Sequence, residues 1–293
     1  MKKNSLLVIS AGVLWGLLGV FSRLLAAVGF DSAGVLIVRC GIAALFFGVT
    51  LLVRDPGMFK VRLRDFWCFF GAGICSLLLF TYCYIQTIAV TSLSTAAVLL
   101  YTAPSMVMLM SLFIFRERLT VSKVLALLLA FAGCCLVSGL GTDESALSAF
   151  GLICGLLSGF GYALYSIFAR LAMDRGYSSL TVNFYSCLLA ALGASAIWGS
   201  YSAVRLMFTG WENFLLCLAT GVITCYMPYL LYTKGLSGME AGRASIMASI
   251  EPVVATVAGI VVFREKLTLA GGCGVALVLA AIVILNLKHK AKS

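Results

Sequence analysis

Long apolar runs alternate with short polar breaks along the whole chain. Charged residues, glycine clusters and turn residues separate ten such runs. Because each helical residue contributes about 1.5 Å and the hydrocarbon core of a bilayer is about 30 Å thick, a run of about 20 apolar residues predicts a membrane-spanning helix. We therefore predict an all-α polytopic membrane protein with ten transmembrane helices, at 5–27, 32–53, 66–88, 93–115, 121–140, 149–171, 179–200, 211–233, 241–263 and 268–287.

The polar breaks are too short to hold a soluble domain. The longest covers 54–65, and the chain is 62% apolar and 11% charged, whereas about 25% of the residues are charged in soluble proteins. The first run follows Lys2 and Lys3, as a signal peptide does, but it is long, lacks a clear cleavage site and precedes nine further runs. We expect it to remain as the first helix.

The net charge of +10 is concentrated at the ends of the predicted spans. With a cytoplasmic N-terminus, sixteen Lys and Arg residues fall on the cytoplasmic side, and four fall outside, namely Arg23, Arg205, Arg264 and Lys266. Cytoplasmic loops of membrane proteins carry an excess of Lys and Arg. The distribution predicts a multi-pass protein of the cytoplasmic (inner) membrane with both termini in the cytoplasm, and it argues against nucleic acid as a partner.

One polar break occurs twice. FRERLT at 115–120 recurs as FREKLT at 263–268, which is 148 residues later. At the same spacing Pro104 pairs with Pro252. Residues 95–120 and 243–268, which end with the two copies, are identical at seven of 26 positions. The chain therefore reads as two copies of one five-helix unit.

An odd number of spans in each copy turns the second copy over in the membrane. We predict two inverted five-helix repeats, 1–145 and 146–293. Many secondary transporters have this organisation, with a substrate site near the bilayer midplane between the repeats. Exchange of conformations between the two copies would open the site to one side and then to the other, which is alternating access.

Several features occur in a fixed order along the chain. They are the five-plus-five spans, the pair Trp15–Gly16, the mid-span Pro104 and Pro252, and the stretch SIEPVVATVAGIVVFREKLT at 249–268. Together they resemble the EamA-type ten-helix exporters of the drug/metabolite transporter (DMT) superfamily. The resemblance implies a secondary transporter that moves small organic metabolites, often amino acids or related compounds, mostly outward and without ATP.

Glu251 is the one carboxylate that we place near the middle of a predicted span, and its partner in the first copy is Ala103. An ionised side chain at that depth costs at least about 2.5–3.5 kcal/mol, so intramembrane carboxylates usually face a cavity and act there. Glu251 is our candidate for proton coupling or for binding a substrate amine. The alternative is a structural carboxyl group that bonds to nearby polar groups.

Arg39 lies within the second predicted span. It could bind a substrate carboxylate, pair with Glu251, or extend to the outer interface. Pro104, Pro228 and Pro252 each remove a backbone donor inside a span, so we expect helix kinks there, which are tolerated beside a cavity or a partner helix.

Aromatic and polar residues also occur deep within the predicted spans. Binding pockets are commonly apolar and aromatic with a few polar groups, although each residue could equally serve helix packing. The predicted substrate-binding set is Trp15, Arg39, Tyr82, Gln86, Tyr101, Tyr162, Asn183, Tyr226, Tyr229 and Glu251.

The placement of cysteine, histidine and carboxylate residues argues against a metal site, a cofactor site and an enzyme active site. The eleven cysteines form no C-x-x-C pattern and the one histidine, His289, lies in the basic tail, so we predict no metal site and no cofactor. An intramembrane enzyme would need a cluster of reactive groups, and the sequence offers one central carboxylate. The expected partners are a small-molecule substrate, the lipid bilayer and, as an alternative to uncoupled facilitation, protons; the chain is expected to act as a monomer or a weak homodimer.

Overall fold

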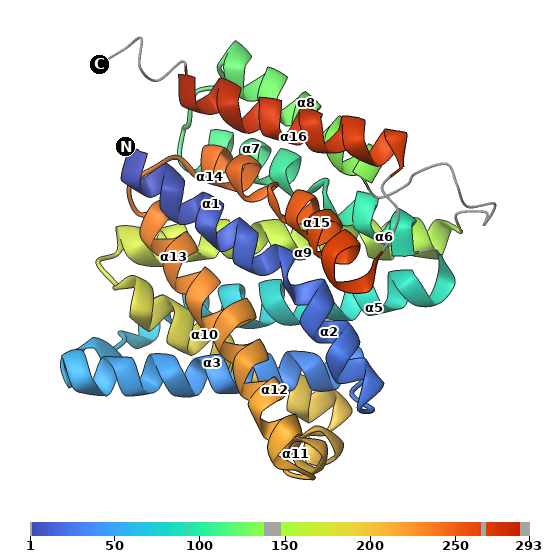
Figure 1. Cartoon of the computed structure of the whole chain (residues 1–293). Coiled ribbons are helices and arrows are strands. Elements are labelled where there is room, and N and C mark those ends of the chain that lie inside the picture. The colour runs from blue at the N-terminus through green and yellow to red at the C-terminus, as the bar shows by residue number, and fades with distance from the viewer. Residues whose placement is uncertain (1, 92, 138–147, 265–267, 288–293) are drawn as a thin grey trace.

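The computed structural model describes residues 2–91, 93–137, 148–264 and 268–287, and the regular structure in these segments is helical throughout (Figure 1). The first half of the chain contains α1 (Lys2–Gly16), α2 (Leu18–Ala27), α3 (Ser32–Arg54), η1 (Pro56–Phe59), η2 (Leu63–Asp65), α4 (Phe66–Phe70), η3 (Gly71–Leu78), α5 (Leu79–Val90), α6 (Leu93–Leu100), α7 (Ala103–Ile114) and α8 (Val121–Val137). The second half contains α9 (Ala149–Asp174), α10 (Ser179–Trp198), α11 (Tyr201–Met207), α12 (Trp211–Gly221), η4 (Val222–Tyr226), α13 (Met227–Leu236), α14 (Ala241–Ala248), α15 (Glu251–Phe263) and α16 (Leu269–Leu287).

The molecule is a multi-pass membrane protein. Within the described residues, eight helical stretches are long and apolar enough to cross a bilayer, and each coincides with one of the predicted spans. The predicted spans 121–140 and 268–287 coincide with α8 and α16, which are shorter apolar helices, and 138–140 lies outside the described residues. The short α11 lies between two spans, where the sequence predicted only a connection.

Three spans are each made of two separate helices, and the first of them is divided at Leu17 into α1 and α2. The span that contains α6 and α7 breaks at Tyr101 and Thr102, and the span that contains α14 and α15 breaks at Ser249 and Ile250. Pro104 and Pro252 lie at the second position of α7 and α15, where a proline loses no intrahelical hydrogen bond. These prolines therefore begin a helix, and each break separates two short helices within the span.

Irregular backbone recurs at the spacing of the sequence repeat. The α6–α7 and α14–α15 breaks lie 148 residues apart, and the third and eighth spans each contain a π-helical segment, η3 and η4. Among the described residues, the non-glycine residues with positive φ are Arg116, at 53°, and Arg264, at 56°, which are equivalent positions of FRERLT and FREKLT. Each of these arginines follows the end of a span and turns the chain away from it.

The α6–α7 span and the α14–α15 span each pack against the first helix of the opposite half. A Cβ added at Gly12 in α1 would lie 2.9 Å from the carbonyl oxygen of Ala248, beside the α14–α15 break. A Cβ added at Gly159 in α9 would lie 2.9 Å from the carbonyl oxygen of Leu99, beside the α6–α7 break. Glycine at these positions allows the close helix approach that small residues commonly provide in membranes.

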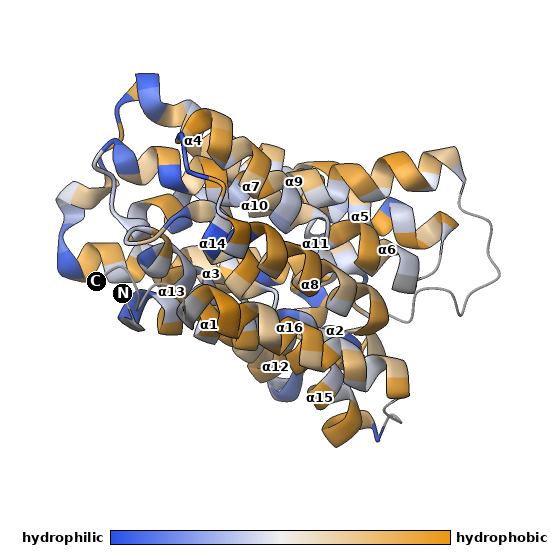
Figure 2. Ribbon diagram, turned by 90° about the horizontal axis from the view of Figure 1, so that it is seen from above, coloured by the Kyte–Doolittle hydropathy of each residue, from blue (hydrophilic) through white to orange (hydrophobic). Residues whose placement is uncertain are grey.

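One end of the bundle is markedly more hydrophilic than the rest of it. Figure 2 shows hydrophilic residues gathered at the end where α1 begins. We call this end the basic face, and we define it by Arg62, Lys123, Arg170 and Arg175, which make their polar contacts there.

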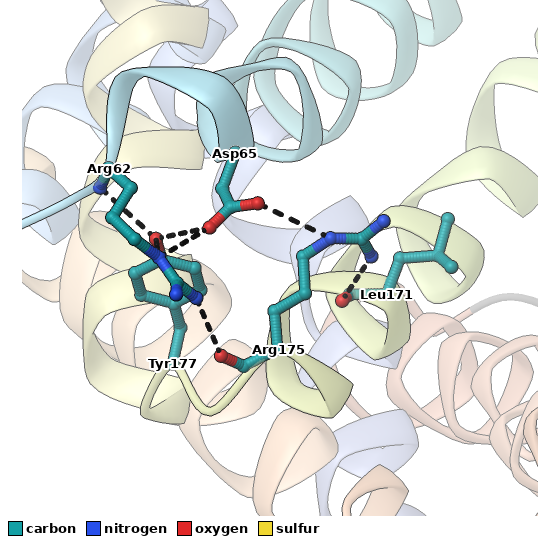
Figure 3. Close-up of polar contacts among 5 residues, drawn as sticks. All are labelled: Arg62, Asp65, Leu171, Arg175 and Tyr177. Atoms are coloured by element: carbon teal, nitrogen blue, oxygen red, sulfur yellow. Dashed lines mark hydrogen bonds and ion pairs between the residues drawn. The ribbon is translucent and has the colours of Figure 1, made fainter.

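A polar cluster joins the two halves at the basic face (Figure 3). The Asp65 carboxylate, at the end of η2, lies 2.9 Å from Arg62 Nε and 3.5 Å from Arg175 Nε. The Tyr177 hydroxyl donates to the same carboxylate over 2.8 Å. Because Arg175 and Tyr177 belong to the α9–α10 connection, this cluster fixes the start of the third span against the second half.

The Gly159 contact yields a stability prediction. A methyl group there would meet backbone and the Thr102 hydroxyl oxygen, 2.7 Å away, so Gly159→Ala is expected to destabilise the fold by about 1–3 kcal/mol through overpacking. A Cβ at Gly41 in α3 would have nothing within 4 Å, so Gly41→Ala is the matched control and should be close to neutral. The midpoint of thermal unfolding in detergent tests this, and equal midpoints for the two variants would contradict the packing argument.

Candidate functional site

A narrow pocket lies between the two halves of the chain. It has an empty volume of about 350 Å³ including its open part. The first half supplies Trp15 from α1, Ser76 and Leu77 from η3, and Phe80 from α5; the second half supplies Tyr162, Tyr165 and Ser166 from α9, Tyr229 and Tyr232 from α13, and Ser245 and Ala248 from α14. Two of the irregular elements, the π-helical η3 and the broken α14–α15 span, contribute residues to its lining.

The pocket wall is built around Trp15. The centroid of its ring lies 6.4 Å from that of Tyr162, 5.2 Å from that of Tyr229 and 5.2 Å from that of Tyr232. The Tyr162 and Tyr229 contacts are edge-on, an arrangement that aromatic pairs favour. Trp15 therefore packs against rings from two helices of the second half and closes one side of the pocket.

Helical periodicity explains why the tyrosines meet. Residues three or four apart share one face of a helix. Tyr162 and Tyr165 therefore project from the same face of α9, and Tyr229 and Tyr232 project from one face of α13. The ring centroids of Tyr165 and Tyr229 lie 4.8 Å apart, so the two faces are in direct contact.

Glu251 is the first residue of α15 and lies directly after the break. Its carboxylate Oε2 accepts a hydrogen bond from the Tyr162 hydroxyl over 3.1 Å. A carboxylate in the first turn of a helix is also stabilised by the free amide groups there. Because Tyr162 lines the pocket, this bond links the carboxylate directly to the pocket wall.

Arg39 is buried in α3 with 8% of its surface exposed. Its side chain lies beside Cys225 and Tyr229, and Tyr229 lines the pocket whereas Arg39 does not. In the part of the chain that the structure describes, its Nε atom has no hydrogen-bond partner and no carboxylate forms an ion pair with it, including that of Glu251. A buried guanidinium without an anion is costly, so Arg39 is a cation that an incoming anionic group could satisfy.

Ser76 is a polar pocket residue that the sequence analysis did not select. Its hydroxyl is completely buried and has no hydrogen-bond partner among the described residues. It lies in η3, and π-helical segments inside α-helices are frequent at functional sites. The hydroxyl is therefore available to a polar group of a bound molecule.

The structure brings four of the predicted site residues together and places the others elsewhere. Trp15, Tyr162 and Tyr229 line the pocket, Glu251 is hydrogen-bonded to Tyr162, and Arg39 lies beside Tyr229 without lining the pocket.

Asn183 is completely buried behind the pocket wall. It accepts a hydrogen bond from the Tyr165 hydroxyl and donates one to Thr233 Oγ1 over 3.0 Å, so it connects α9, α10 and α13.

The remaining predicted residues lie outside the pocket lining. The Tyr226 hydroxyl is 3.0 Å from Thr50 Oγ1, and Tyr82 packs against Trp198 with 42% of its surface exposed. Gln86 is partly buried in α5, and Tyr101 lies at the α6–α7 break against an apolar cluster that includes Cys134.

The sequence analysis also missed Phe80, Tyr165, Ser166, Tyr232 and Ser245. The signal for Tyr165 and Tyr232 was present, because each lies three residues after a tyrosine that was selected. The serines carried no comparable signal, since serine is common in membrane helices wherever they pack closely. In the described residues, no group of three or more His, Cys, Asp or Glu side chains is arranged to hold a metal ion.

Comparison with known proteins gives consistent matches over the whole chain. The model of the EamA-like transporter family matches twice, at residues 2–139 and 149–287. An uncharacterized transporter of Archaeoglobus fulgidus is 31% identical over 97% of this chain and 96% of its own length, and the uncharacterized transporter YxxF of Bacillus subtilis is 25% identical over 96% of this chain and 88% of its own. A solved crystal structure covers all of both chains with a TM-score of 0.81 and 16% identity, which shows a shared fold.

Asn183 provides a test of the wall behind the pocket. Asn183→Ala leaves the buried Tyr165 hydroxyl without its acceptor and removes the bond to Thr233, so we expect a loss of about 1–3 kcal/mol in the free energy of unfolding. Asn213→Ala, which removes one long bond of 3.3 Å to the Leu206 carbonyl, should cost much less. Thermal unfolding of the two variants in detergent makes the comparison, and an equal or smaller loss for Asn183→Ala would show that the network contributes nothing.

Proposed function

We propose, since this chain belongs to the EamA-like transporter family, that the pocket between its halves binds a small organic solute and carries it across the membrane. The observation that carries this proposal is the composition of the pocket. Aromatic rings from both halves line it together with the buried free hydroxyl of Ser76, the Glu251 carboxylate is hydrogen-bonded to Tyr162 of its wall, and the Arg39 guanidinium lies beside Tyr229.

The chemistry of the pocket favours an amphipathic solute over a bare ion. The aromatic rings of Trp15, Tyr162 and Tyr229 offer apolar surface, and they attract cations over their faces. Glu251 can receive an ammonium group, and Arg39 can receive a carboxylate once Tyr229 moves. An amino acid or a related metabolite carries both groups on a small organic frame.

The proposed mechanism is alternating access between two inverted five-helix repeats. The family model matches each half separately, and the α6–α7 and α14–α15 spans each pack against the first helix of the other half. Irregular backbone within a membrane is tolerated where it is buried in protein or lines a cavity. A change in the angle between the two helices at each break would therefore expose the pocket at one end of the bundle while closing it at the other.

Export from the cytoplasm is the proposed direction, with proton exchange at Glu251 as the coupling step. Protonation would remove the charge on the carboxylate and change its bond with Tyr162, which lines the pocket. The alternative is a facilitator without a coupling ion, which would move the same solutes down their own gradient. In both cases the protein acts as a carrier in a cytoplasmic membrane and not as an enzyme.

Flux in proteoliposomes tests the proposal. Purified protein is screened with labelled amino acids and related amphipathic metabolites, with and without an imposed proton gradient. We expect saturable flux that the gradient accelerates, and loss of this acceleration in Glu251→Gln. Glu212→Gln, an exposed carboxylate at the start of α12, is the matched control and should behave as the wild type.

Each other outcome of this experiment has a definite meaning. Flux that is independent of the proton gradient in the wild type would establish that the protein is a facilitator. Gradient-driven flux that persists in Glu251→Gln would remove Glu251 from the coupling step. Absence of saturable flux for every solute would overturn the transporter proposal for this pocket.

Ser76 gives a separate prediction about solute binding. Loss of one hydrogen bond to the solute should raise the half-saturating concentration about 3- to 10-fold in Ser76→Ala. Ser111→Ala is the matched control, because the Ser111 hydroxyl is also completely buried and without a partner among the described residues, but it does not line the pocket. Concentration dependence of flux measures both, and an unchanged value for Ser76→Ala would exclude contact with the solute.

A further inference from the structure

We propose that Glu117 is the residue that holds the pocket closed at the basic face, by capping the start of α14 from the other half of the protein. The inference rests on the proposed transport function and identifies a positioning residue for it. Its Oε1 atom accepts a hydrogen bond from the Ala241 amide over 2.6 Å, and its Oε2 atom accepts one from the Gly242 amide over 3.3 Å. We call this pair of bonds the Glu117 cap.

The start of α14 needs an external partner. The first amide groups of a helix have no intrahelical acceptor, and a carboxylate placed there also interacts favourably with the helix dipole. Glu240 immediately precedes α14, but its side chain makes no capping bond. Glu117, which is 124 residues away from Ala241 along the chain, supplies the carboxylate instead.

The backbone at the end of α7 directs the Glu117 side chain towards the start of α14. Arg116 adopts a left-handed conformation after α7, and the amide of Glu117 donates to the Ser111 carbonyl over 3.2 Å, which closes the end of that helix. The Glu117 side chain is consequently directed to α14, with only 11% of its surface exposed. This assigns a physical role to the Arg-Glu pair of FRERLT.

A buried lysine ties the cap to its surroundings. Lys123 Nζ lies 2.8 Å from Glu240 Oε2 and 3.7 Å from Glu117 Oε2, and it donates to the Arg118 carbonyl over 3.0 Å. The side chain of Lys123 is 7% exposed. The lysine thus neutralises carboxylates from both halves, and separation of α14 from the 116–118 turn would break the Lys123–Glu240 ion pair together with the Glu117 cap.

The cap is one helical turn from the pocket. Every residue of α14 is buried, and Ser245, which lies four residues after Ala241, lines the pocket together with Ala248. α14 then leads through the break to Glu251. Movement of the start of α14 would therefore open a path to the pocket from the basic face, and the Glu117 cap opposes that movement.

Thiol labelling from the basic face tests the inference. Ser245→Cys serves as the reporter, and a membrane-impermeant thiol reagent is applied to vesicles from the basic face. Loss of charge-assisted bonds should raise the labelling rate about tenfold in Glu117→Ala and by a smaller factor in Glu117→Gln. The same Glu117 variants without the reporter give the contribution of the native cysteines.

The matched control is Asp174→Asn. Asp174 also pairs with an arginine, Arg170, over 2.9 Å, but both residues belong to α9, so its loss should leave the labelling rate unchanged. An unchanged rate in both Glu117 variants would overturn the inference. Because this rate is measured without solute, failure of the transport proposal would show separately, as absence of flux in the wild type.

A second measurement covers variants that fold poorly. Cysteines placed by Glu117→Cys and Ala241→Cys can be joined by a short bifunctional thiol reagent. If the cap must break during transport, joining the two positions should abolish solute flux, whereas each single variant treated in the same way should retain it. Continued flux in the joined protein would contradict the role of the cap.

Discussion

The break between α14 and α15 is the feature on which the rest of the proposed site depends. In a bilayer, backbone groups that leave a helix need partners inside the protein, so a break in a span must be enclosed. Here α1 encloses it, because glycine at position 12 lets the helix approach the Ala248 carbonyl oxygen. The same approach sets Trp15 against the tyrosines of the second half and leaves Glu251 at the start of a new helix beside Tyr162. Packing at this one break thus sets the positions of both the pocket wall and the Glu251 carboxylate beside it.

Among the described residues, two sets of polar contacts that involve carboxylates join the halves at the basic face. At the basic face, Asp65 joins η2 to the α9–α10 connection, and Glu117 joins the end of α7 to α14. These contacts combine charge with hydrogen bonds, and several of the side chains are largely buried, so they are stronger than exposed ion pairs. A transporter that closes one end of its pocket with bonds of this kind must replace them with other favourable interactions whenever that end opens. In the proposed cycle, these replacement interactions come from the bound solute and from closure of the opposite end.

Much of the fold could be predicted from the sequence, because a bilayer imposes length and composition on every span. Eight of the ten predicted runs coincide with helical stretches that are long and apolar enough to cross a bilayer, and the doubled FRERLT motif marked equivalent ends at Arg116 and Arg264. Pro104 and Pro252 marked two of the divided spans, where the sequence indicated a kink and the structure has two separate helices, whereas the division at Leu17 has no proline beside it. Glu251 was recognisable because a carboxylate deep in an apolar run is costly.

The pocket could be predicted only in part, because the rotation of each helix is decided by packing. In soluble proteins a polar face marks the outside of a helix, whereas lipid-facing and pocket-facing positions here are both apolar or aromatic. Tyr82 and Tyr162 were therefore indistinguishable in the sequence, although one packs against Trp198 near the surface and the other lines the pocket. The free hydroxyl of Ser76 and the Glu117 cap depend on contacts between distant segments, which no local pattern records.

The central claim is that the two ends of the bundle open in alternation around one pocket, and distances between spin labels test it most directly. One pair of labels at positions 63 and 234 joins the halves at the basic face, and a second pair at positions 90 and 201 joins them at the opposite end; all four side chains are exposed. On addition of a transported solute, pulsed electron paramagnetic resonance should show that one pair separates while the other approaches. Distances that stay constant, or that change in the same direction at both ends while solute flux continues, would contradict the account.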